Sequence, residues 1–523
     1  MEPAEEEVLK LLDLQKPMND AIGRGDSDVQ QFYKGVTVFI TGGSGFIGKQ
    51  LIEKLFRSCA IEKMYLLLRP KKKIPIQERL QQILNDTVFQ LVYEKNPHFA
   101  DKIVPVEGDI SMIRMGMNEE QRTQITKEVN VIFHVAATTK FNAPLREATF
   151  TNVLGTREAL ALAKECTKCK SFVHVSTAFT HATKDRVGKE FSEQFYPSPL
   201  SPDTLIQLVE NVDENRLNCI TQDLLYLWPN TYTFTKAIAE ELIRTSAGDL
   251  PVCIVRPPIV VPAYCEPAPG WLDASTIFGP SGFILGILLG VLHVFFADLS
   301  TKLSIAPVDF VNNITIVAPW DAEKRRRKGD VNIPVYNATK NNNCCTPGFI
   351  REVLLDARSK FCSPKAVWHC YSFITKNHVR YRILTFFLHY IPAYLLDIVL
   401  DIIGKKPKNL KSFVKLYKKC DEYFAVYSFF LSSSWDFKNQ NSTAMLSRMS
   451  DTDRAIFNCD IAALDMKEFV VIWALGIRKY IIKDGLKGSR AAAKWQCVYI
   501  TMNYVILIAI LYILWKLFAF VAM

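Results

Sequence analysis

The chain has 523 residues, 49% hydrophobic and 22% charged, with a formal net charge of +10 at pH 7. This length predicts two or three domains with a large core. The 13 cysteines are odd in number and lack framework spacing, and Cys166 and Cys169 have no second pair to complete a zinc site. We therefore expect reduced thiols, no metal and, because the basic clusters suit a membrane surface or a phosphate-rich substrate, no nucleic acid.

Residues 1–34 form an N-terminal extension whose role the sequence leaves open. It begins with the acidic stretch MEPAEEEVLKLLDLQK, which lacks the apolar run of a secretory signal peptide. We expect the folded body of the protein to lie in the cytosol.

A dinucleotide-binding fingerprint follows. GVTVFITGGSGFIGKQLIEKLFRS begins at residue 35, with a β-rich run at 36–40 and a helical pattern at 46–58. Glycines between them allow a tight turn, and the helix N-terminus favours a pyrophosphate. The spacing is Gly-x-x-Gly-x-x-Gly rather than the commoner Gly-x-Gly-x-x-Gly. The residues expected to contact the cofactor here are Thr41, Gly42, Gly45, Phe46, Ile47 and Gly48.

The end of the second strand indicates which dinucleotide binds. The stretch KMYLLLRPKKK places Arg69 where an acidic residue would bind the ribose hydroxyls of NAD. Arg69, with Lys71 nearby, would instead neutralise a 2′-phosphate. The sequence therefore favours NADPH.

Further strand patterns lie at 102–109, 129–137, 171–178 and 251–261, separated by helical patterns. This alternation predicts an α/β fold with a Rossmann-like, doubly wound parallel sheet. Ligands of such sheets lie at the carboxyl ends of the strands. The remaining cofactor-binding candidates are Asp109, Ile110, Ala136, Ala137, Thr138, Asn152, Pro257 and Ile259, together with Tyr232 and Lys236.

The stretch NTYTFTKAIAE brings Tyr232 and Lys236 onto one face of a predicted helix. The pair is a weak signal alone, but Ser176 and Thr177 end a strand about 55 residues earlier. This order resembles the extended short-chain dehydrogenase/reductases, whose active site combines Ser or Thr, Tyr and Lys. Such a tyrosine donates a proton to a carbonyl oxygen, and a lysine cation favours its ionisation. We prefer Thr177 to Ser176 as the catalytic hydroxyl.

Three apolar segments occupy the C-terminal half. GFILGILLGVLHVFFA, 282–297, is short for a span and is expected to be a helix that lines an apolar pocket or dips into a membrane; a true span and a plain core helix are the alternatives. The segment 383–404 is typical of an amphipathic, interfacial helix. The run 497–520 predicts a transmembrane helix, and the basic residues before it keep the body in the cytosol. We expect a single-pass protein of the endoplasmic reticulum, with peroxisome and lipid droplet left open.

Several stretches resemble the fatty acyl-CoA reductases, especially the insect forms. They include VIFHVAATTKFNAPLREATFTNVLGT, IVRPPIVVPAYCEPAPGW and MSDTDRAIFNCDIAALDMKEFVVIWALGIRKYIIKD. After Asp273, and at Pro258, the chain departs from that family's usual pattern. The resemblance implies a reductase domain at 35–335 and a helical domain at 336–490.

The resemblance also implies an activity: reduction of long-chain acyl-CoA by NADPH, through an enzyme-bound aldehyde, to a primary alcohol. Alternatives are a membrane-bound extended reductase of another carbonyl substrate, such as a sterol, and an inactive membrane scaffold. The oligomeric state stays open.

Overall fold

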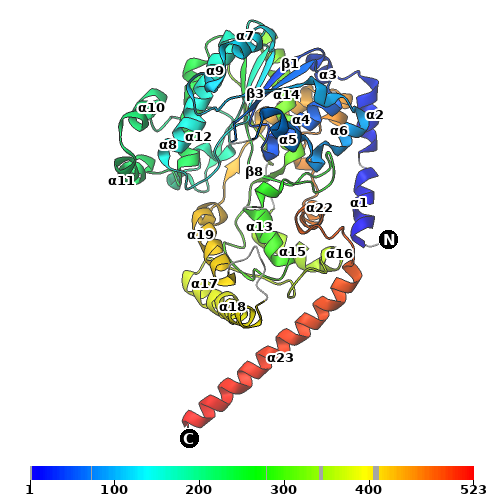
Figure 1. The fold of residues 1–523 in the computed structure, drawn as a ribbon, viewed down its shortest axis with the longest axis vertical. Helices are drawn as coiled ribbons and strands as arrows, with labels where there is room; N and C mark the ends of the chain where they lie inside the picture. Colours follow the sequence, from blue (N-terminus) through cyan, green and yellow to red (C-terminus); the bar gives the residue numbers. More distant parts are fainter. Residues whose placement is uncertain are drawn as a thin grey trace.

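A seven-stranded sheet forms the centre of the N-terminal part (Figure 1). The structure, a computed structural model, describes residues 3–13, 15–71, 74–277, 279–340, 345–404 and 412–522. All neighbouring strands are parallel, in the order β11-β7-β5-β4-β1-β2-β3. The strands are β1 (Thr37–Thr41), β2 (Lys63–Leu68), β3 (Ile103–Glu107), β4 (Val131–His134), β5 (Ser171–Val175), β7 (Val252–Arg256) and β11 (Val335–Asn337). The predicted doubly wound parallel sheet is confirmed, and its order reverses between β1 and β4.

Helices cover both faces of the sheet, so its strands are apolar on both sides. In β1, Val38 and Ile40 pack with α4 (Phe46–Ser58) and α14 (Val308–Arg327). Phe39 faces the other layer, to which α7, α9 and α12 contribute. The helices of this part are α5 (Ile76–Leu84), α6 (Gln90–Lys95), α7 (Glu119–Glu128), α8 (Leu145–Thr149), α9 (Gly155–Glu165), α10 (Pro202–Asn211), α11 (Glu214–Leu225) and α12 (Thr231–Ser246). The next helix in the chain, α13 (Pro280–Leu288), lies below the sheet (Figure 1).

The C-terminal region is mostly helical, as predicted. Its helices between residues 347 and 431 lie below the sheet in Figure 1, whereas residues 440–448 pack against β11 and α14. The predicted boundary at 335/336 falls inside β11. The helices are α15 (Pro347–Asp356), α16 (Arg358–Phe361), α17 (His378–Thr385), α18 (Ile391–Ile403), α19 (Phe413–Leu431), α20 (Gln440–Arg448), α21 (Asp451–Ile456), α22 (Met466–Gly476) and α23 (Ser489–Ala522). Short strands are β6 (Glu190–Phe191), β8 (Ile259–Val261), β9 (Val294–Phe296), β10 (Ile305–Pro307), β12 (Phe373–Thr375) and β13 (Asp436–Phe437).

The N-terminal extension packs on this body. It contains α1 (Pro3–Asp13), α2 (Lys16–Arg24) and α3 (Asp28–Tyr33). Val29 and Tyr33 are fully buried, and the Val29 N–H donates to Asp453 of α21 at 3.1 Å. The extension therefore joins the sheet domain to the C-terminal helices.

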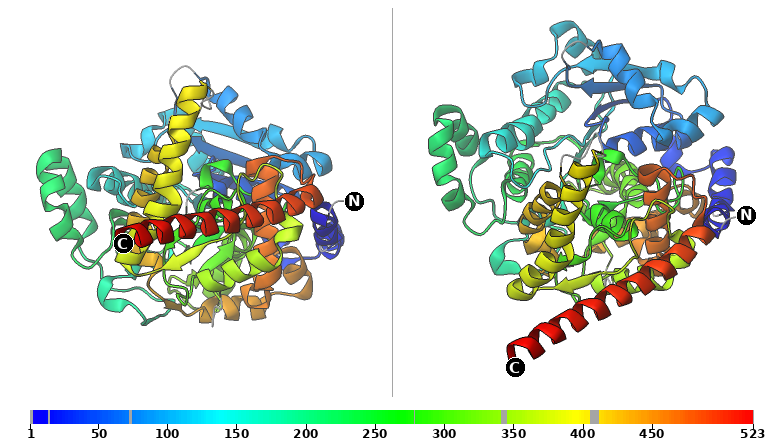
Figure 2. Two further views of the ribbon diagram at one scale, coloured as in Figure 1. Left: turned by 90° about the horizontal axis from the view of Figure 1, so that it is seen from below. Right: turned by 60° about the horizontal axis from the view of Figure 1, so that its bottom comes forward.

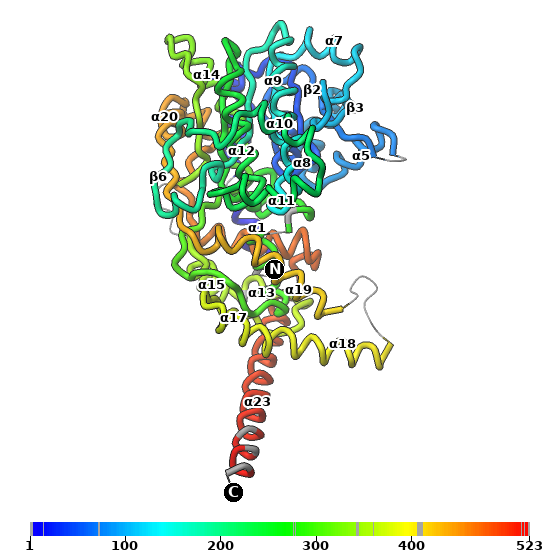
Figure 3. Tube along the Cα trace, turned by 90° about the vertical axis from the view of Figure 1, so that its left-hand side faces the viewer, coloured from blue at the N-terminus to red at the C-terminus, as the bar shows by residue number. Residues whose placement is uncertain are grey.

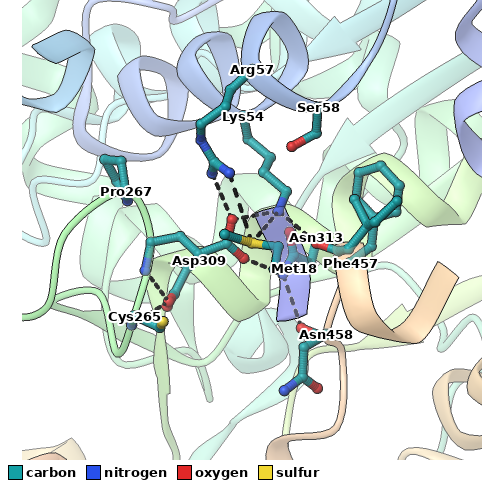
Figure 4. Close-up of polar contacts among 12 residues, drawn as sticks. Met18, Lys54, Arg57, Ser58, Cys265, Pro267, Asp309, Asn313, Phe457 and Asn458 are labelled. Carbon is teal, nitrogen blue, oxygen red and sulfur yellow. Dashed lines mark hydrogen bonds and ion pairs between the residues drawn. The ribbon is translucent and has the colours of Figure 1, made fainter. Parts of the chain in front are cut away.

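A buried ionic cluster makes a second connection between these parts (Figure 4). Glu266 accepts hydrogen bonds from Lys54 and from Arg57, the latter at 2.6 Å, and both cations lie on α4. Lys54 also donates to the Ile456 carbonyl at 2.6 Å. Asp309 accepts the Glu266 N–H at 3.0 Å, which fixes the loop that carries this carboxylate.

The apolar segment 282–297 is not one helix, which corrects our expectation. α13 ends at Leu288 because Gly290 turns with φ +65°, and β9 follows. A Cβ on Gly290 would lie 2.2 Å from the Trp368 carbonyl oxygen, so only glycine fits. The segment does line an apolar cavity of about 60 Å³. Side chains around it include Phe283, Ile284, Ile287, Phe295, Ile350, Phe424 and Leu431.

The last helix, α23, projects from the body as a continuous rod (Figures 1 and 3). Its first turns are docked: Ser489 accepts from Arg478 at 2.7 Å, Gln496 accepts the Cys370 N–H at 2.8 Å, and Tyr499 stacks on Trp368. Two helices of the described chain, 378–403 and 489–520, are long and apolar enough to cross a membrane.

Candidate active site

The glycine loop connects β1 to α4 at the point where the strand order reverses. Gly42 has φ +77°, and a Cβ there would lie 2.6 Å from the Ala136 nitrogen. A Cβ on Gly48 would lie 2.3 Å from the Gly42 carbonyl oxygen. Glycine is therefore required at both positions. Gly45 precedes the first turn of α4, which no side chain caps, so that helix end suits a phosphate.

Thr41 serves the backbone of this crevice. Its hydroxyl accepts the Ala136 N–H at 3.2 Å and contacts His134 Nδ1 at 2.9 Å. The structure thus brings the end of β1, with the following Phe46 and Ile47 at the start of α4, against the end of β4 with Ala136 and Ala137. Sequence spacing predicted this meeting of strand ends.

A cationic group lies beyond β2. Arg69 pairs with Asp109 at 3.0 Å, so these two predicted residues do meet. Burial and then the Arg69 charge lower the pKa of Arg79 on α5. Arg79 Nη1 is buried and has no hydrogen-bond partner among the described residues. Lys71 lies nearby in sequence and is exposed. Sequence analysis missed Arg79, because nothing in the helical pattern of 76–84 distinguishes it from a surface arginine.

Asn152 links the crevice to α12. It lies in a π-helical turn, Phe150–Leu154, and its Oδ1 accepts the Thr138 N–H at 2.9 Å. Its Nδ2 donates to the Thr235 hydroxyl on α12 at 3.0 Å. Such π-helical turns occur often at functional sites. Ile110, another predicted residue, is buried and packs against Gly155 in the helix that follows.

Tyr232, Lys236 and Thr177 come together at the carboxyl end of β5. Asn230 caps α12 by accepting the Thr233 N–H at 2.9 Å, which sets the start of the helix. One turn further, buried Lys236 donates to the carbonyl of Val175, the last residue of β5, at 2.8 Å. The Thr177 side chain lies close enough to the Tyr232 hydroxyl to lower its pKa.

The electrostatics differ from our expectation for tyrosine. Burial raises the pKa of Tyr232 to about 12, and the nearby Thr177 side chain only partly opposes this. Burial lowers the pKa of Lys236 to about 8, against the effect of the Glu240 carboxylate, which raises it. In this structure desolvation outweighs any lowering of the phenol pKa by the neighbouring lysine. Tyr232 therefore keeps its proton at neutral pH.

Ser176 points into a different network. Its hydroxyl donates to Glu240 Oε1 at 2.5 Å, and Glu240 pairs with Arg256 at 2.5 Å. Thr177, in contrast, contacts Tyr232 and donates to the Pro257 carbonyl at 3.4 Å. Ile259 lies just beyond, in β8. Sequence analysis missed Glu240, although one more i,i+4 step along α12 from Lys236 reaches it.

An aromatic cover closes over the tyrosine. Phe141 stacks on Tyr232 with ring centroids 5.8 Å apart. Phe141 in turn contacts Tyr427 and Phe430 of α19, at 4.8 and 5.2 Å. α19 also carries Phe424 and Leu431, which line the apolar cavity. One helix of the C-terminal region thus contacts both the surroundings of Tyr232 and the cavity.

Comparison with known proteins agrees with this geometry. Residues 40–315 match an NAD-binding domain model and residues 388–484 a Sterile domain model, both described as "Male sterility protein". The first model supports a nicotinamide cofactor. Fatty acyl-CoA reductase wat of Drosophila melanogaster is 36% identical over 465 residues, 88% of this chain and 87% of that protein.

Vertebrate relatives and a solved structure extend the comparison. Fatty acyl-CoA reductase 1 of Homo sapiens is 32% identical over 492 residues, 94% of this chain and 93% of that protein. The crystal structure of the terminal R domain from the myxalamid PKS-NRPS biosynthetic pathway shares the fold, with TM-score 0.55 at 19% identity over 86% of this chain and 92% of that one. From residue 40 to residue 484 the resemblance seen in the motifs is confirmed, and the chain belongs to the fatty acyl-CoA reductase family.

Proposed function

We propose that this protein reduces long-chain fatty acyl-CoA to the primary fatty alcohol with NADPH, through an enzyme-bound aldehyde and with release of CoA. The observation that carries the proposal is the contact of Tyr232 with Thr177 at the end of β5, with Lys236 one turn along α12. Family membership supports the reaction class.

The residues divide the chemistry between them. NADPH, when bound, supplies the hydride for each of the two reductions. Tyr232 holds a proton at neutral pH and donates it to the carbonyl oxygen as negative charge develops there. Thr177 donates a second hydrogen bond to that oxygen, and Lys236 orients the cofactor ribose. The same three groups act on the thioester and then on the aldehyde.

The choice of NADPH over NADH rests on the cations beyond β2. Arg69 and Arg79 lie close enough for one charge to lower the pKa of the other. Two guanidinium groups with a buried unpartnered nitrogen suit a doubly charged phosphate. The glycine loop and the open end of α4 would hold the pyrophosphate.

The apolar cavity is the proposed binding site for the acyl chain. The cavity between α13, α15 and α19 is lined almost wholly by apolar side chains, and α19 runs from it to the aromatic cover of Tyr232. Burial of each CH₂ contributes about 0.8 kcal/mol. We further propose that α23 crosses a membrane, with the body in the cytosol and the endoplasmic reticulum as the favoured location. Membranes are where long-chain substrate and alcohol partition.

Product analysis tests the reaction. Membranes containing the full chain are incubated with NADPH and palmitoyl-CoA, and hexadecanol, free CoA and NADP⁺ are quantified. We expect one alcohol and one CoA for every two NADPH consumed. Tyr232→Phe removes the proton donor and should lower turnover by about 10²–10⁴-fold while NADPH still binds.

The matched control is Tyr226→Phe, which removes an equivalent hydroxyl from a side chain that is 74% exposed. It should retain full activity. Wild-type turnover in Tyr232→Phe would refute the proposed mechanism, and absence of alcohol with every acyl-CoA length would refute the proposed substrate.

A further inference from the structure

The helix formed by α17, the π-helical turn Phe386–Tyr390 and α18 has an unusual distribution of side chains. It runs without interruption over residues 378–403, and only 17% of its most apolar window is buried. A surface helix of a soluble domain normally buries its apolar face and exposes its polar one. Here the two faces are reversed.

The face toward the protein carries polar groups. Tyr381 donates to Asp421 of α19 at 2.6 Å, and His389 accepts the His293 N–H at 2.9 Å. Asp397 accepts from the Ser412 hydroxyl at 2.7 Å and from the Phe413 N–H at 3.0 Å, which caps α19. These contacts hold the helix along α19.

The opposite face is apolar and open. Leu395 is 60% exposed and Ile402 79% exposed. Side chains that share this exposure are Val379, Ile383, Phe386, Phe387, Tyr394, Leu396, Ile398, Val399 and Ile403. A continuous exposed apolar surface of this length is typical of contact with another apolar phase rather than with water.

The helix cannot cross a bilayer while it keeps these contacts. α19 packs along it and exposes Lys415, Lys418, Lys419 and Glu422. A transmembrane position would bring those charges into the hydrocarbon, which strongly disfavours charged side chains. A position in the plane of the interface needs no such transfer, because only the apolar face enters the lipid.

Charge and orientation favour a lipid surface over another protein. Arg380 and Arg382 are exposed near the start of the helix, and Lys415, Lys418 and Lys419 are exposed on α19, whose Tyr417 stacks on His389 near the middle of the helix. Such cations suit anionic headgroups. Figure 3 shows α18 lying across the direction of α23, at the end of the molecule away from the sheet, and the view from below in Figure 2 shows the same crossing.

We propose that residues 378–403 form a second membrane-binding element that lies in the plane of the interface, with its apolar face in one leaflet of an anionic bilayer. The proposal does not require the reaction proposed above. Because α19 lies against this helix and lines the apolar cavity, such docking holds that cavity next to the leaflet.

Site-specific photocrosslinking in the full-length protein tests the element. A benzophenone amino acid replaces Leu395, whose exposed side chain takes little part in packing. The purified protein is reconstituted in vesicles of phosphatidylcholine and phosphatidylserine that contain an alkyne-bearing lipid, irradiated, and analysed for lipid adducts. Val331, which is apolar, 77% exposed and located after α14, is the matched control. Ile506 of α23 reports separately on the tail.

We expect lipid adducts when the probe is at position 395 and none when it is at position 331. Adducts at 395 together with none at 506 would still support the in-plane helix. That result would contradict only the separate proposal that α23 crosses the membrane. A yield at 395 no higher than at 331 would overturn the proposal. Adducts between two protein chains at 395 would also overturn it, because the apolar face would then bind a second copy.

Discussion

Removal of the Glu266 charge should destabilise the fold strongly. Glu266→Gln keeps the size of the side chain but removes the carboxylate that Lys54 and Arg57 share. Arg57 keeps Glu53, with hydrogen bonds at 2.6 and 3.2 Å. Among the described residues Lys54 would then have only neutral acceptors, which include the Ile456 carbonyl and the Met18 sulfur. A buried ammonium group would thus lose its counter-ion.

The pKa of Glu266 gives the magnitude. Burial raises it, but Lys54 and Arg57 lower it further, from 4.5 to about 2. At 1.36 kcal/mol per pKa unit, this corresponds to about 3 kcal/mol of stability at pH 7. Removal of one partner of a buried ion pair typically costs about 3–5 kcal/mol, in the same range. Since the folded-state pKa is lowered, the contribution is present above pH 4.5 and is lost as the pH falls toward 2.

Denaturant unfolding of the purified full-length protein measures the change. Glu266→Gln should lower the free energy of unfolding by about 3 kcal/mol at pH 7. Glu119→Gln, which breaks an exposed pair with Arg114, should change it by less than about 1 kcal/mol. Lys54→Met combined with Glu266→Gln removes both charges and should recover part of the loss. Equal stability of Glu266→Gln and Glu119→Gln at pH 7 would refute this reasoning.

Three further predictions concern activity. Because burial lowers the pKa of Lys236 to about 8, its ammonium form is lost as the pH rises through that value, so kcat/KM should fall above pH 8. Lys236→Arg should remove this fall at high pH. An unchanged pH profile in that variant would contradict the assignment of the fall to Lys236. Arg69→Ala should weaken NADPH binding by about 10-fold or more, from the loss of one charged hydrogen bond, with little effect on NADH in a fluorescence titration; equal losses would remove Arg69 from phosphate recognition. Ile287→Trp should fill the cavity and shift preference toward shorter acyl-CoA chains in a chain-length series, whereas an unchanged preference would place the acyl chain elsewhere.

Local sequence patterns predicted those parts of the candidate site that lie within one loop, strand end or helix. The glycine turn, the ends of β1 and β4, and the spacing of Tyr232 and Lys236 all follow from a strand or helix period and its capping residues. The parallel sheet then required those strand ends to lie along one edge. Arg69 and Asp109 met for the same reason.

Contacts between distant segments could not be predicted in this way. Phe141 reaches Tyr427, 286 residues away, through packing that no local period encodes. β11 has three residues, which is too short for a strand pattern to be recognised in the sequence. It forms a strand because it pairs with the edge of β7. The pKa of Tyr232 depends on how fully the site is desolvated, which spacing does not determine. The fate of segment 282–297 depended on Trp368, whose carbonyl leaves room only for glycine at position 290.

The attachment of α23 determines how the protein would sit on a bilayer. The helix has 34 residues, about 51 Å at 1.5 Å per residue, and no flexible linker separates it from the body. Its first three turns are held by hydrogen bonds with Arg478 and Cys370 and by a ring contact with Trp368. A flexible linker would let the body rotate freely relative to α23. The docked turns instead fix the angle between the body and the bilayer and the distance between them. Insertion of two residues after Tyr499, beyond the docked turns, would rotate the body about the helix axis relative to the rest of α23, so the direction faced by the crevice is set by the phase of a single helix.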